Sequence, residues 1–187
     1  MTLKDVHVDY GPIHAVGDLT LEIPIGSSVA IIGPNGSGKS SLLKVIGDVI
    51  DPTSGTCDTA GATTAIVLQS TDIDQSIPLT VRDVIAMARF PGLGLFRRPS
   101  AVDRTAIDSA MNRLEIADLA HRQIHQLSGG QRQRAFVAQG LAQDADILLL
   151  DEPLTGLDVR SRSIILSVLD DEHAAGRTVM TTTHNFD

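Results

Sequence analysis

One glycine-rich segment constrains the fold of this chain of 187 residues more than any other feature. Residues 33–40 have the sequence Gly-Pro-Asn-Gly-Ser-Gly-Lys-Ser, and they follow a short β-branched run at residues 28–32 that is typical of a strand buried on both faces. A helical stripe of apolar residues begins at Ser40 and stops before Asp51 and Pro52, because the residue before a proline avoids the helical conformation. The segment therefore predicts a strand, a glycine-rich turn and a helix in direct succession.

This succession matches the P-loop pattern, which binds the phosphates of a nucleotide. Glycines let successive backbone N–H groups point at an anion, and the helix dipole adds about half a positive charge at the same place. Lys39 supplies a full charge to the β- and γ-phosphates, and the Ser40 hydroxyl is placed to bind Mg²⁺. The formal net charge of −8 does not oppose this, because charges beyond about 8 Å are largely screened at physiological salt. The alternative is a glycine-rich turn beside a surface lysine.

Strand and helix patterns alternate along the rest of the chain, which favours an α/β fold with a mainly parallel sheet. The further expected strands are residues 2–10, 19–23, 63–68, 147–150 and 178–183. A helix is expected over residues 159–175, and the pattern is helical from about residue 77 to residue 143. We predict one domain in which residues 1–76 and 144–187 form a P-loop NTPase (RecA-like) core with an N-terminal antiparallel β part. Residues 77–143 are expected to form an inserted α-helical subdomain.

Two acids, Asp151 and Glu152, follow the apolar strand expected at residues 147–150. Ligands bind at the carboxyl ends of strands in open α/β sheets. Asp151 is therefore placed to support Mg²⁺. Glu152 is placed to accept a proton from an attacking water, a role that contributes about 10²–10⁴-fold in rate. The alternative is an ordinary pair of surface acids at a strand end.

A second glycine-rich segment, with the sequence Gln-Leu-Ser-Gly-Gly-Gln at residues 126–131, precedes a helix expected over residues 132–142. Ser128 is suited to cap that helix, and glycines at a helix start expose N–H groups that offer a second anion site. Residues 127–131 resemble the signature sequence of ABC-type ATPases, and the other motifs of that family occur in order over essentially the whole chain. In that family two ATPase domains pack head to tail, and the signature of one contacts the γ-phosphate held by the other. The alternative is a glycine-rich helix start that serves only as a cap.

The resemblance implies roles for further residues. Gln69 is similar to the Q-loop glutamine, which approaches Mg²⁺ and the attacking water, and His184 is similar to the switch histidine, which contacts the γ-phosphate. Asp158 lies in a segment that resembles the D-loop of the dimer interface, and Tyr10 stands where the family stacks an aromatic ring on adenine. The expected ATP contacts are Tyr10, Gly33, Pro34, Asn35, Gly36, Ser37, Gly38, Lys39, Ser40, Ser41, Ser128, Gly129, Gly130, Gln131 and Asp158. The expected catalytic residues are Lys39, Gln69, Glu152 and His184, and the expected Mg²⁺ ligands are Ser40, Gln69 and Asp151.

Some of these residues have simpler interpretations. Tyr10 is also consistent with a half-buried strand tyrosine, and a histidine after a strand, such as His184, is more often structural. The spacing of His121 and His125 would allow zinc binding on one helix. No acid lies between these two histidines and no third ligand is evident, so a turn leading to Ser128 is favoured over a metal site.

The resemblance implies ATP hydrolysis by a head-to-tail homodimer that drives transport. The acidic balance disfavours nucleic acid as a partner, and no apolar run approaches the roughly 20 residues of a membrane span. We therefore expect separate membrane-spanning permease subunits, indirect contact with a solute-binding protein, and a location at the cytoplasmic face of the cell membrane. Residues 77–89 and 94–99 are similar to importers of manganese or zinc ions and, less so, of iron-siderophore chelates. The alternative is an ABC ATPase without a permease, such as an iron–sulfur assembly ATPase.

The position of His184 near the end of the sequence carries one more expectation. Chains of the family usually continue for some tens of residues past the switch histidine, and this sequence ends at Asp187. The resemblance therefore implies that C-terminal strands and helices of the family are absent. We expect hydrolysis to be weak or dependent on a partner, compared with a longer chain.

Overall fold

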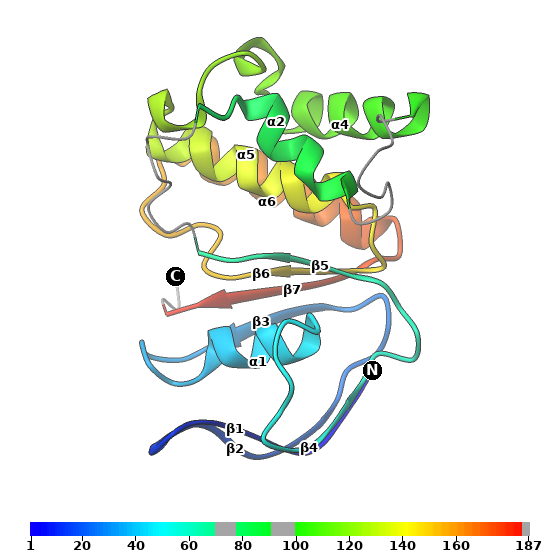
Figure 1. Cartoon of the computed structure of the whole chain (residues 1–187), viewed down its shortest axis with the longest axis vertical. Coiled ribbons are helices and arrows are strands. Elements are labelled where there is room, and N and C mark those ends of the chain that lie inside the picture. The colour runs from blue at the N-terminus through cyan, green and yellow to red at the C-terminus, as the bar shows by residue number, and fades with distance from the viewer. Residues whose placement is uncertain (70–77, 91–99, 185–187) are drawn as a thin grey trace. The chain divides into compact units, whose positions relative to one another are not determined.

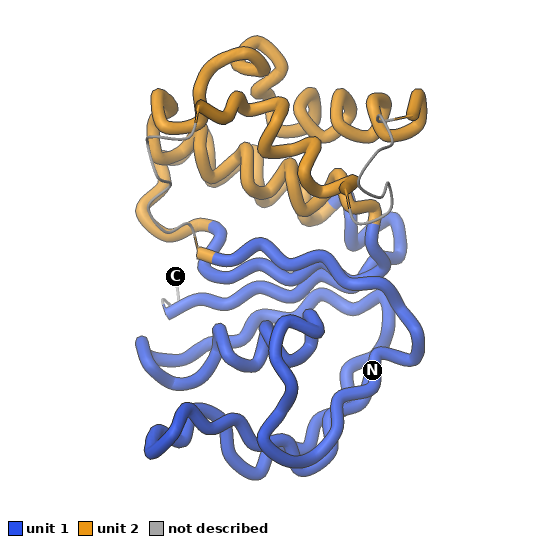
Figure 2. The backbone as a smooth tube through the Cα atoms, viewed as in Figure 1, with its two compact units in different colours: residues 1–68, 145–153, 171–187 blue, residues 69–144, 154–170 orange. Residues whose placement is uncertain are grey.

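The computed structural model describes residues 1–69, 78–90 and 100–184 (Figure 1). The predicted boundary between residues 76 and 77 and the segment at residues 94–99 lie outside the described residues. The chain divides into two compact units, of which unit 1 holds residues 1–68, 145–153 and 171–187, and unit 2 holds residues 69–144 and 154–170 (Figure 2). Among the described residues, no helix has both the length and the apolar composition that a membrane span requires.

Unit 1 contains a four-stranded parallel sheet with the strand order β3-β7-β6-β5. Its strands are β3 (Ser28–Ile32), β5 (Thr64–Val67), β6 (Ile147–Leu150) and β7 (Thr178–Thr183). Ile32 pairs with Thr183, and Leu150 pairs with Thr181 on one side and Val67 on the other. The carboxyl ends of the four strands therefore meet at one edge of the sheet, and the predicted parallel α/β fold is confirmed.

Burial differs between the centre and the margin of this sheet. All four residues of β6 are buried, as expected for an aliphatic strand that pairs on both sides. β3 alternates between exposed and half-buried residues, and Ile32 is 47% exposed. The prediction of a strand buried on both faces is wrong for β3, because β3 lies at the margin of the described sheet and pairs there with β7 alone.

A second, antiparallel sheet with the order β2-β1-β4 confirms the predicted N-terminal β part. Its strands are β1 (Thr2–Tyr10), β2 (Ile13–Glu22) and β4 (Ser54–Asp58). β4 is not among the strands expected from the sequence, because its residues Ser-Gly-Thr-Cys-Asp show no apolar alternation. The backbone pairing of Leu3 with Cys57 and its neighbours holds β4 in the sheet.

Helix α1 (Lys39–Ile46) lies between the two sheets of unit 1 (Figure 1). Its apolar side packs into one core with residues of both sheets, including Leu3 of β1, Leu43 and Ile46 of α1, and Leu149 of β6. These four side chains are at most 1% exposed. The core therefore anchors α1, and with it the glycine-rich segment that precedes the helix.

Unit 2 is helical. It contains α2 (Val81–Ala86), η1 (Met87–Arg89), α4 (Ala101–Arg113), η2 (Ala117–Leu119), η3 (Ile124–Gln126), α5 (Gly129–Ala142) and residues 159–170 of α6 (Val159–Ala174). Thr80, Ser100 and Ser128 cap α2, α4 and α5, each with a reciprocal capping box. α5 begins three residues before the helix expected from residue 132, because Ser128 accepts a hydrogen bond from the N–H of Gln131 and so draws the two glycines into the first turn.

Candidate functional site

The glycine-rich segment forms a loop between β3 and α1. Gly36 and Gly38 have φ angles of 80° and 84°, in the left-handed region that favours glycine. Gly38 also allows a close backbone approach, because a Cβ atom there would lie 2.0 Å from the carbonyl oxygen of Ala15 in β2. The conformation of the loop therefore depends on these glycines.

Lys39 places its charge against this loop. The side chain is 7% exposed, and its Nζ atom donates hydrogen bonds to the carbonyl oxygens of Gly33 and Pro34 at 2.7 and 2.9 Å. Lys39 also begins α1, where free backbone N–H groups and the helix dipole favour an anion. A full positive charge and a helix N-terminus thus converge on one loop, which is the chemistry of a phosphate site.

The first turn of α1 contacts the end of β1. Ser40 and Ser41 are half-buried, and the Ser41 hydroxyl donates a hydrogen bond to the Tyr10 hydroxyl at 3.4 Å. Tyr10 ends β1 and is 46% exposed. The Tyr10 ring therefore stands beside the loop and is accessible to a flat ligand. Asn35 and Ser37 are exposed in the loop itself.

Asp151 and Glu152 follow the buried strand β6 and contact β7. Asp151 is 4% exposed, and the Thr182 hydroxyl donates a hydrogen bond to its Oδ1 atom at 2.6 Å. The same hydroxyl accepts a hydrogen bond from the backbone N–H of Glu152 at 2.8 Å. Glu152 has a φ of 48°, which is uncommon for a residue with a side chain. Asp151 is therefore a buried and oriented carboxylate and does not belong to an ordinary pair of surface acids.

His184 follows β7 and contacts Glu152. The Nδ1 atom of His184 lies 3.1 Å from Oε2 of Glu152, a close contact without the geometry of a hydrogen bond. The backbone N–H of Gly33 donates to the carbonyl oxygen of Thr183 at 3.3 Å, so His184 directly follows a residue that is bonded to the glycine-rich loop. The structure thus brings Lys39, Ser40, Asp151, Glu152 and His184 to one edge of the parallel sheet.

The side chains at this edge suit Mg²⁺. The Ser40 hydroxyl and the Asp151 carboxylate are oxygen ligands, and Mg²⁺ is commonly bound through one or two carboxylates together with phosphates and water. One oxygen of Asp151 is bonded to Thr182, and no hydrogen bond within the described residues uses Oδ2. The described residues contain no group of three His, Cys, Asp or Glu side chains that could hold a metal ion by themselves. The donor set therefore fits an ion that is held jointly with a nucleotide.

Gln69, the remaining predicted Mg²⁺ ligand, lies just after β5. It is exposed and is the first residue of unit 2. Its role stays a prediction. The predicted turn around His121 and His125 is present: His121 lies in a turn, and His125 lies in η3 with a buried Nδ1 atom that has no hydrogen bond to any described residue.

Unit 2 carries the second glycine-rich segment and Asp158 side by side. A Cβ atom on Gly130 would lie 2.6 Å from Oδ2 of Asp158 and 2.4 Å from Oγ of Ser161, so the start of α5 needs a glycine to approach the start of α6. Asp158 accepts hydrogen bonds from the N–H and the hydroxyl of Ser161, and these bonds lower the pKa of its carboxyl. A Cβ atom on Gly129 would meet no atom of the other described segments within 4 Å. The two segments that the sequence assigned to one function are therefore neighbours in the fold.

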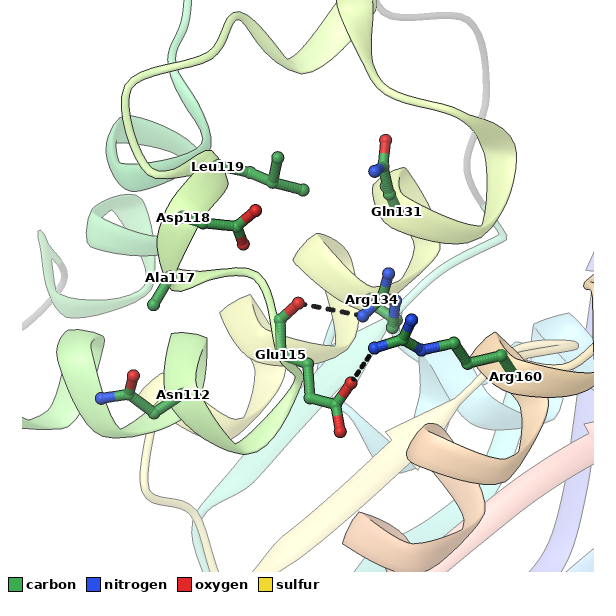
Figure 3. Close-up of a pocket in the computed structure, with 8 residues that line it drawn as sticks. All are labelled: Asn112, Glu115, Ala117, Asp118, Leu119, Gln131, Arg134 and Arg160. Carbon is green, nitrogen blue, oxygen red and sulfur yellow. Dashed lines mark hydrogen bonds and ion pairs between the residues drawn. The ribbon is translucent and has the colours of Figure 1, made fainter.

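A polar pocket of about 480 Å³ lies next to Gln131 in unit 2 (Figure 3). It is lined by Asn112, Glu115, Ala117, Asp118, Leu119, Gln131, Arg134 and Arg160. Arg134 is buried and donates to the carbonyl oxygens of Leu114 and Glu115, and Arg160 pairs with the Glu115 carboxylate at 2.8 Å. These bonds join α4, α5 and α6. Neither Arg134 nor Arg160 belongs to a sequence motif, so the sequence does not indicate that they line a pocket.

A parallel sheet, a glycine-rich loop that leads into a helix, and a buried aspartate at the end of a neighbouring strand define this chain as a P-loop NTPase. The position of the second glycine-rich segment at the start of α5 narrows the class further. The model of the ABC transporter family matches residues 16–155, and the chain belongs to this family. Members of this family bind and hydrolyse ATP for membrane transport, so the predicted ATPase activity is confirmed at the level of the family.

Several well-matched relatives are transport proteins. A manganese transport system ATP-binding protein of Listeria innocua is 36% identical over an alignment of 193 positions, which covers 100% of this chain and 80% of the relative. The corresponding protein of Bacillus subtilis is 36% identical and covers 98% of this chain and 76% of the relative. A chelated iron transport system membrane protein of Yersinia pestis is 35% identical, covering 99% of this chain and 66% of that protein.

Solved structures of the family share the fold. A transporter assigned to the metal-chelate type, in an inward-facing conformation, superposes with a TM-score of 0.86 at 30% identity, over 98% of this chain and 72% of the other. A dimeric ATP-binding cassette in a post-hydrolysis state, bound to ADP and Pi, superposes with a TM-score of 0.80 at 29% identity, over 98% of this chain and 88% of the other. The similarity therefore extends over nearly the whole chain.

Proposed function

We propose that this chain is the ATP-hydrolysing subunit of an importer whose cargo is a metal ion, manganese or zinc, or an iron chelate. The arrangement that carries the ATPase part of the proposal is the single sheet edge that holds Lys39, Asp151, Glu152 and His184. The cargo rests on the relatives, because those named above serve manganese and chelated iron transport. The same relatives favour a transporter over an ATPase without a permease.

ATP binding uses the glycine-rich loop and Tyr10. The loop N–H groups and Lys39 hold the phosphates, and Tyr10 stacks on adenine, a contact worth roughly 1–3 kcal/mol per base. Mg²⁺, when bound through Ser40 and Asp151, supplies positive charge to the β- and γ-phosphates. The buried hydrogen bond from Thr182 keeps Asp151 in a fixed orientation for this purpose.

Hydrolysis uses Glu152 as the general base. Its carboxylate accepts a proton from a water whose oxygen bonds to the γ-phosphorus while the bond from that phosphorus to the β,γ-bridging oxygen breaks in line and ADP leaves. The contact with His184 directs the carboxylate. His184 also contacts the γ-phosphate, and Gln69 orients the water. Loss of the γ-phosphate ends these contacts.

A second copy of the chain completes each site in this proposal. Residues 128–131 and Asp158 contact ATP held in the loop of the second copy. Ser128, Gly129 and Asp158 are exposed on unit 2, and the buried Gly130 lies against Asp158. Permease subunits in the membrane bind the dimer from the cytoplasmic side, and a solute-binding protein acts through the permease. ATP binding closes the dimer, and hydrolysis opens it.

Replacing the base tests this mechanism. We expect Glu152→Gln to keep ATP binding, to lower hydrolysis by about 10²-fold or more, and to accumulate an ATP-dependent dimer, because the nucleotide stays uncleaved between two copies. Hydrolysis is measured by phosphate release, binding with a fluorescent ATP analogue, and association by sedimentation velocity.

The control for this experiment is Glu22→Gln, which makes the same change in an exposed residue of β2. This variant should hydrolyse ATP like the parent and should form no additional dimer. Equal turnover of Glu152→Gln and the parent would contradict the assignment of the base.

A further inference from the structure

Thr182 of β7 bonds to both acids of the candidate site, although no motif includes it. Its side chain is 1% exposed. Its hydroxyl donates a hydrogen bond to Oδ1 of Asp151 at 2.6 Å and accepts one from the backbone N–H of Glu152 at 2.8 Å. The buried hydroxyl of Thr182 therefore acts as a donor to Asp151 and as an acceptor from Glu152, two adjacent site residues.

The bond to Asp151 controls the rotation of a carboxylate. The donor engages Oδ1, and Oδ2 is left without a hydrogen bond from the described residues. Hydrogen-bond partners of a metal-binding carboxylate orient it, and their removal commonly lowers metal affinity or activity by about 10–100-fold. Thr182 thus selects which oxygen of Asp151 is offered to Mg²⁺.

The bond to Glu152 holds an uncommon backbone conformation. A non-glycine residue at a φ of 48° persists only where its surroundings hold it. The N–H of Glu152 is bonded to the Thr182 hydroxyl, and this bond holds the peptide that joins Asp151 to Glu152. The direction in which the Glu152 side chain leaves the backbone therefore depends on Thr182.

Thr182 of β7 and His184, just after this strand, both contact the acid pair. Thr182 bonds to Asp151 and to the Glu152 backbone, and His184 contacts the Glu152 carboxylate. Thr182 lies in β7 and His184 directly follows the strand, so the end of β7 and the residue after it both meet the acid pair. A valine would suit a buried strand position equally well in shape, whereas a hydroxyl is costly there unless it is bonded.

We propose that Thr182 is a positioning residue for ATP hydrolysis, whose hydroxyl sets the orientation of the Asp151 carboxylate and of the Glu152 backbone together. The proposal rests on the proposed roles of Asp151 in Mg²⁺ binding and of Glu152 as the base. It assigns no contact between Thr182 and the nucleotide.

Three variants of the whole chain test the hydroxyl. Thr182→Val removes both hydrogen bonds and keeps the shape, and Thr182→Ser keeps the hydroxyl. Thr181→Val makes the same change one residue earlier in β7, where the hydroxyl has no hydrogen bond within the described residues. Hydrolysis is measured as kcat and KM, and the Mg²⁺ requirement is measured separately by titrating Mg²⁺ into the binding of a fluorescent, non-hydrolysable ATP analogue.

We expect Thr182→Val to lower kcat by about 10–100-fold and to raise the Mg²⁺ concentration for half-maximal binding by about tenfold or more. Nucleotide binding without Mg²⁺ should stay within about twofold of the parent, because the loop and Lys39 are unchanged. Thr182→Ser should recover most of both losses, and Thr181→Val should resemble the parent.

Unchanged kcat and Mg²⁺ requirement in Thr182→Val would overturn the proposal, as would losses in Thr182→Ser as large as those in Thr182→Val. Should Thr182→Val fail to fold, Thr182→Ala carries the same expectations, and loss of the fold in both variants would show a structural role instead. A parent chain that binds ATP but does not hydrolyse it even together with its permease subunits would contradict the proposed function, and the Mg²⁺ titration would still test Thr182.

Discussion

Two features require glycine at positions of the candidate site: a positive φ, and a lack of space for a Cβ atom. Gly38 is required by a positive φ and by the carbonyl oxygen of Ala15, and Gly130 is required by the side chains of Asp158 and Ser161. The need for glycine at both positions is evident from the motifs. The atoms that leave no room for a Cβ are not, because Ala15 and Ser161 are distant in sequence from the glycines that they contact.

Replacing Gly36 and Gly38 by alanine separates the cost of a left-handed φ from the cost of a steric clash of the Cβ atom. Both residues have left-handed φ angles, but a Cβ atom on Gly36 would meet no atom of the described residues within 4 Å. We expect Gly36→Ala to lower the free energy of unfolding by about 1–2 kcal/mol, the cost of a left-handed L-residue. Gly38→Ala should cost clearly more, because β2 or the loop must also move. Urea denaturation of both variants gives the difference, and equal losses would contradict the proposed steric conflict.

At the scale of elements, short capping patterns set the helix starts of unit 2, and these patterns are visible in the sequence. Ser128 and Gln131 form a reciprocal box that begins α5, and Ser100 and Asp103 form another at the start of α4. Asp103 also pairs with Arg89 of η1 at 2.8 Å, a contact that no local pattern indicates. Hydrogen bonds from Ser100 and Arg89 lower the pKa of Asp103 to about 2.

The lowered pKa of Asp103 predicts how the stability of the fold around α4 changes with pH. A carboxyl whose pKa is lower in the folded state than its ordinary value of 3.8 stabilises the fold above that value, and the contribution disappears as pH falls toward about 2. We expect Asp103→Asn to lower the melting temperature at neutral pH. This difference in melting temperature from the parent should shrink as the pH falls from about 5 to about 2.

Asp118→Asn is the matched control for Asp103, because Asp118 lies in the same unit, is exposed and makes no hydrogen bond within the described residues. Its melting temperature should follow that of the parent at every pH, as circular dichroism can measure. A difference between Asp103→Asn and the parent that does not change as the solution is acidified would contradict the role of the Asp103 carboxylate.

At the scale of the whole molecule, the candidate residues fall into two sets. The glycine-rich loop, Asp151, Glu152 and His184 belong to unit 1, and residues 128–131 with Asp158 belong to unit 2. The proposed function joins the two sets through a second copy of the chain. It joins the dimer to a membrane through permease subunits.

Isolating the chain from solubilised membranes tests the proposed binding to permease subunits. We expect the tagged chain, expressed in its own host, to be recovered with detergent-solubilised membranes together with a protein that has several membrane spans, identified by mass spectrometry. A tagged protein of similar size and charge from another family is the control. Recovery of the chain without any such protein would favour an ATPase without a permease.

The sequence by itself determined the fold class and the main chemistry of this protein. The strand, loop and helix around Lys39, the acids after β6 and the cap at Ser128 are encoded in residues adjacent along the chain, so spacing and residue type are sufficient to predict them. Only the tertiary structure decided that β4 pairs with β1, that β3 is an edge strand of the described sheet and that the Thr182 hydroxyl reaches Asp151, 31 residues away. Such contacts depend on strand order and register, which arise from packing between distant segments and leave no local pattern.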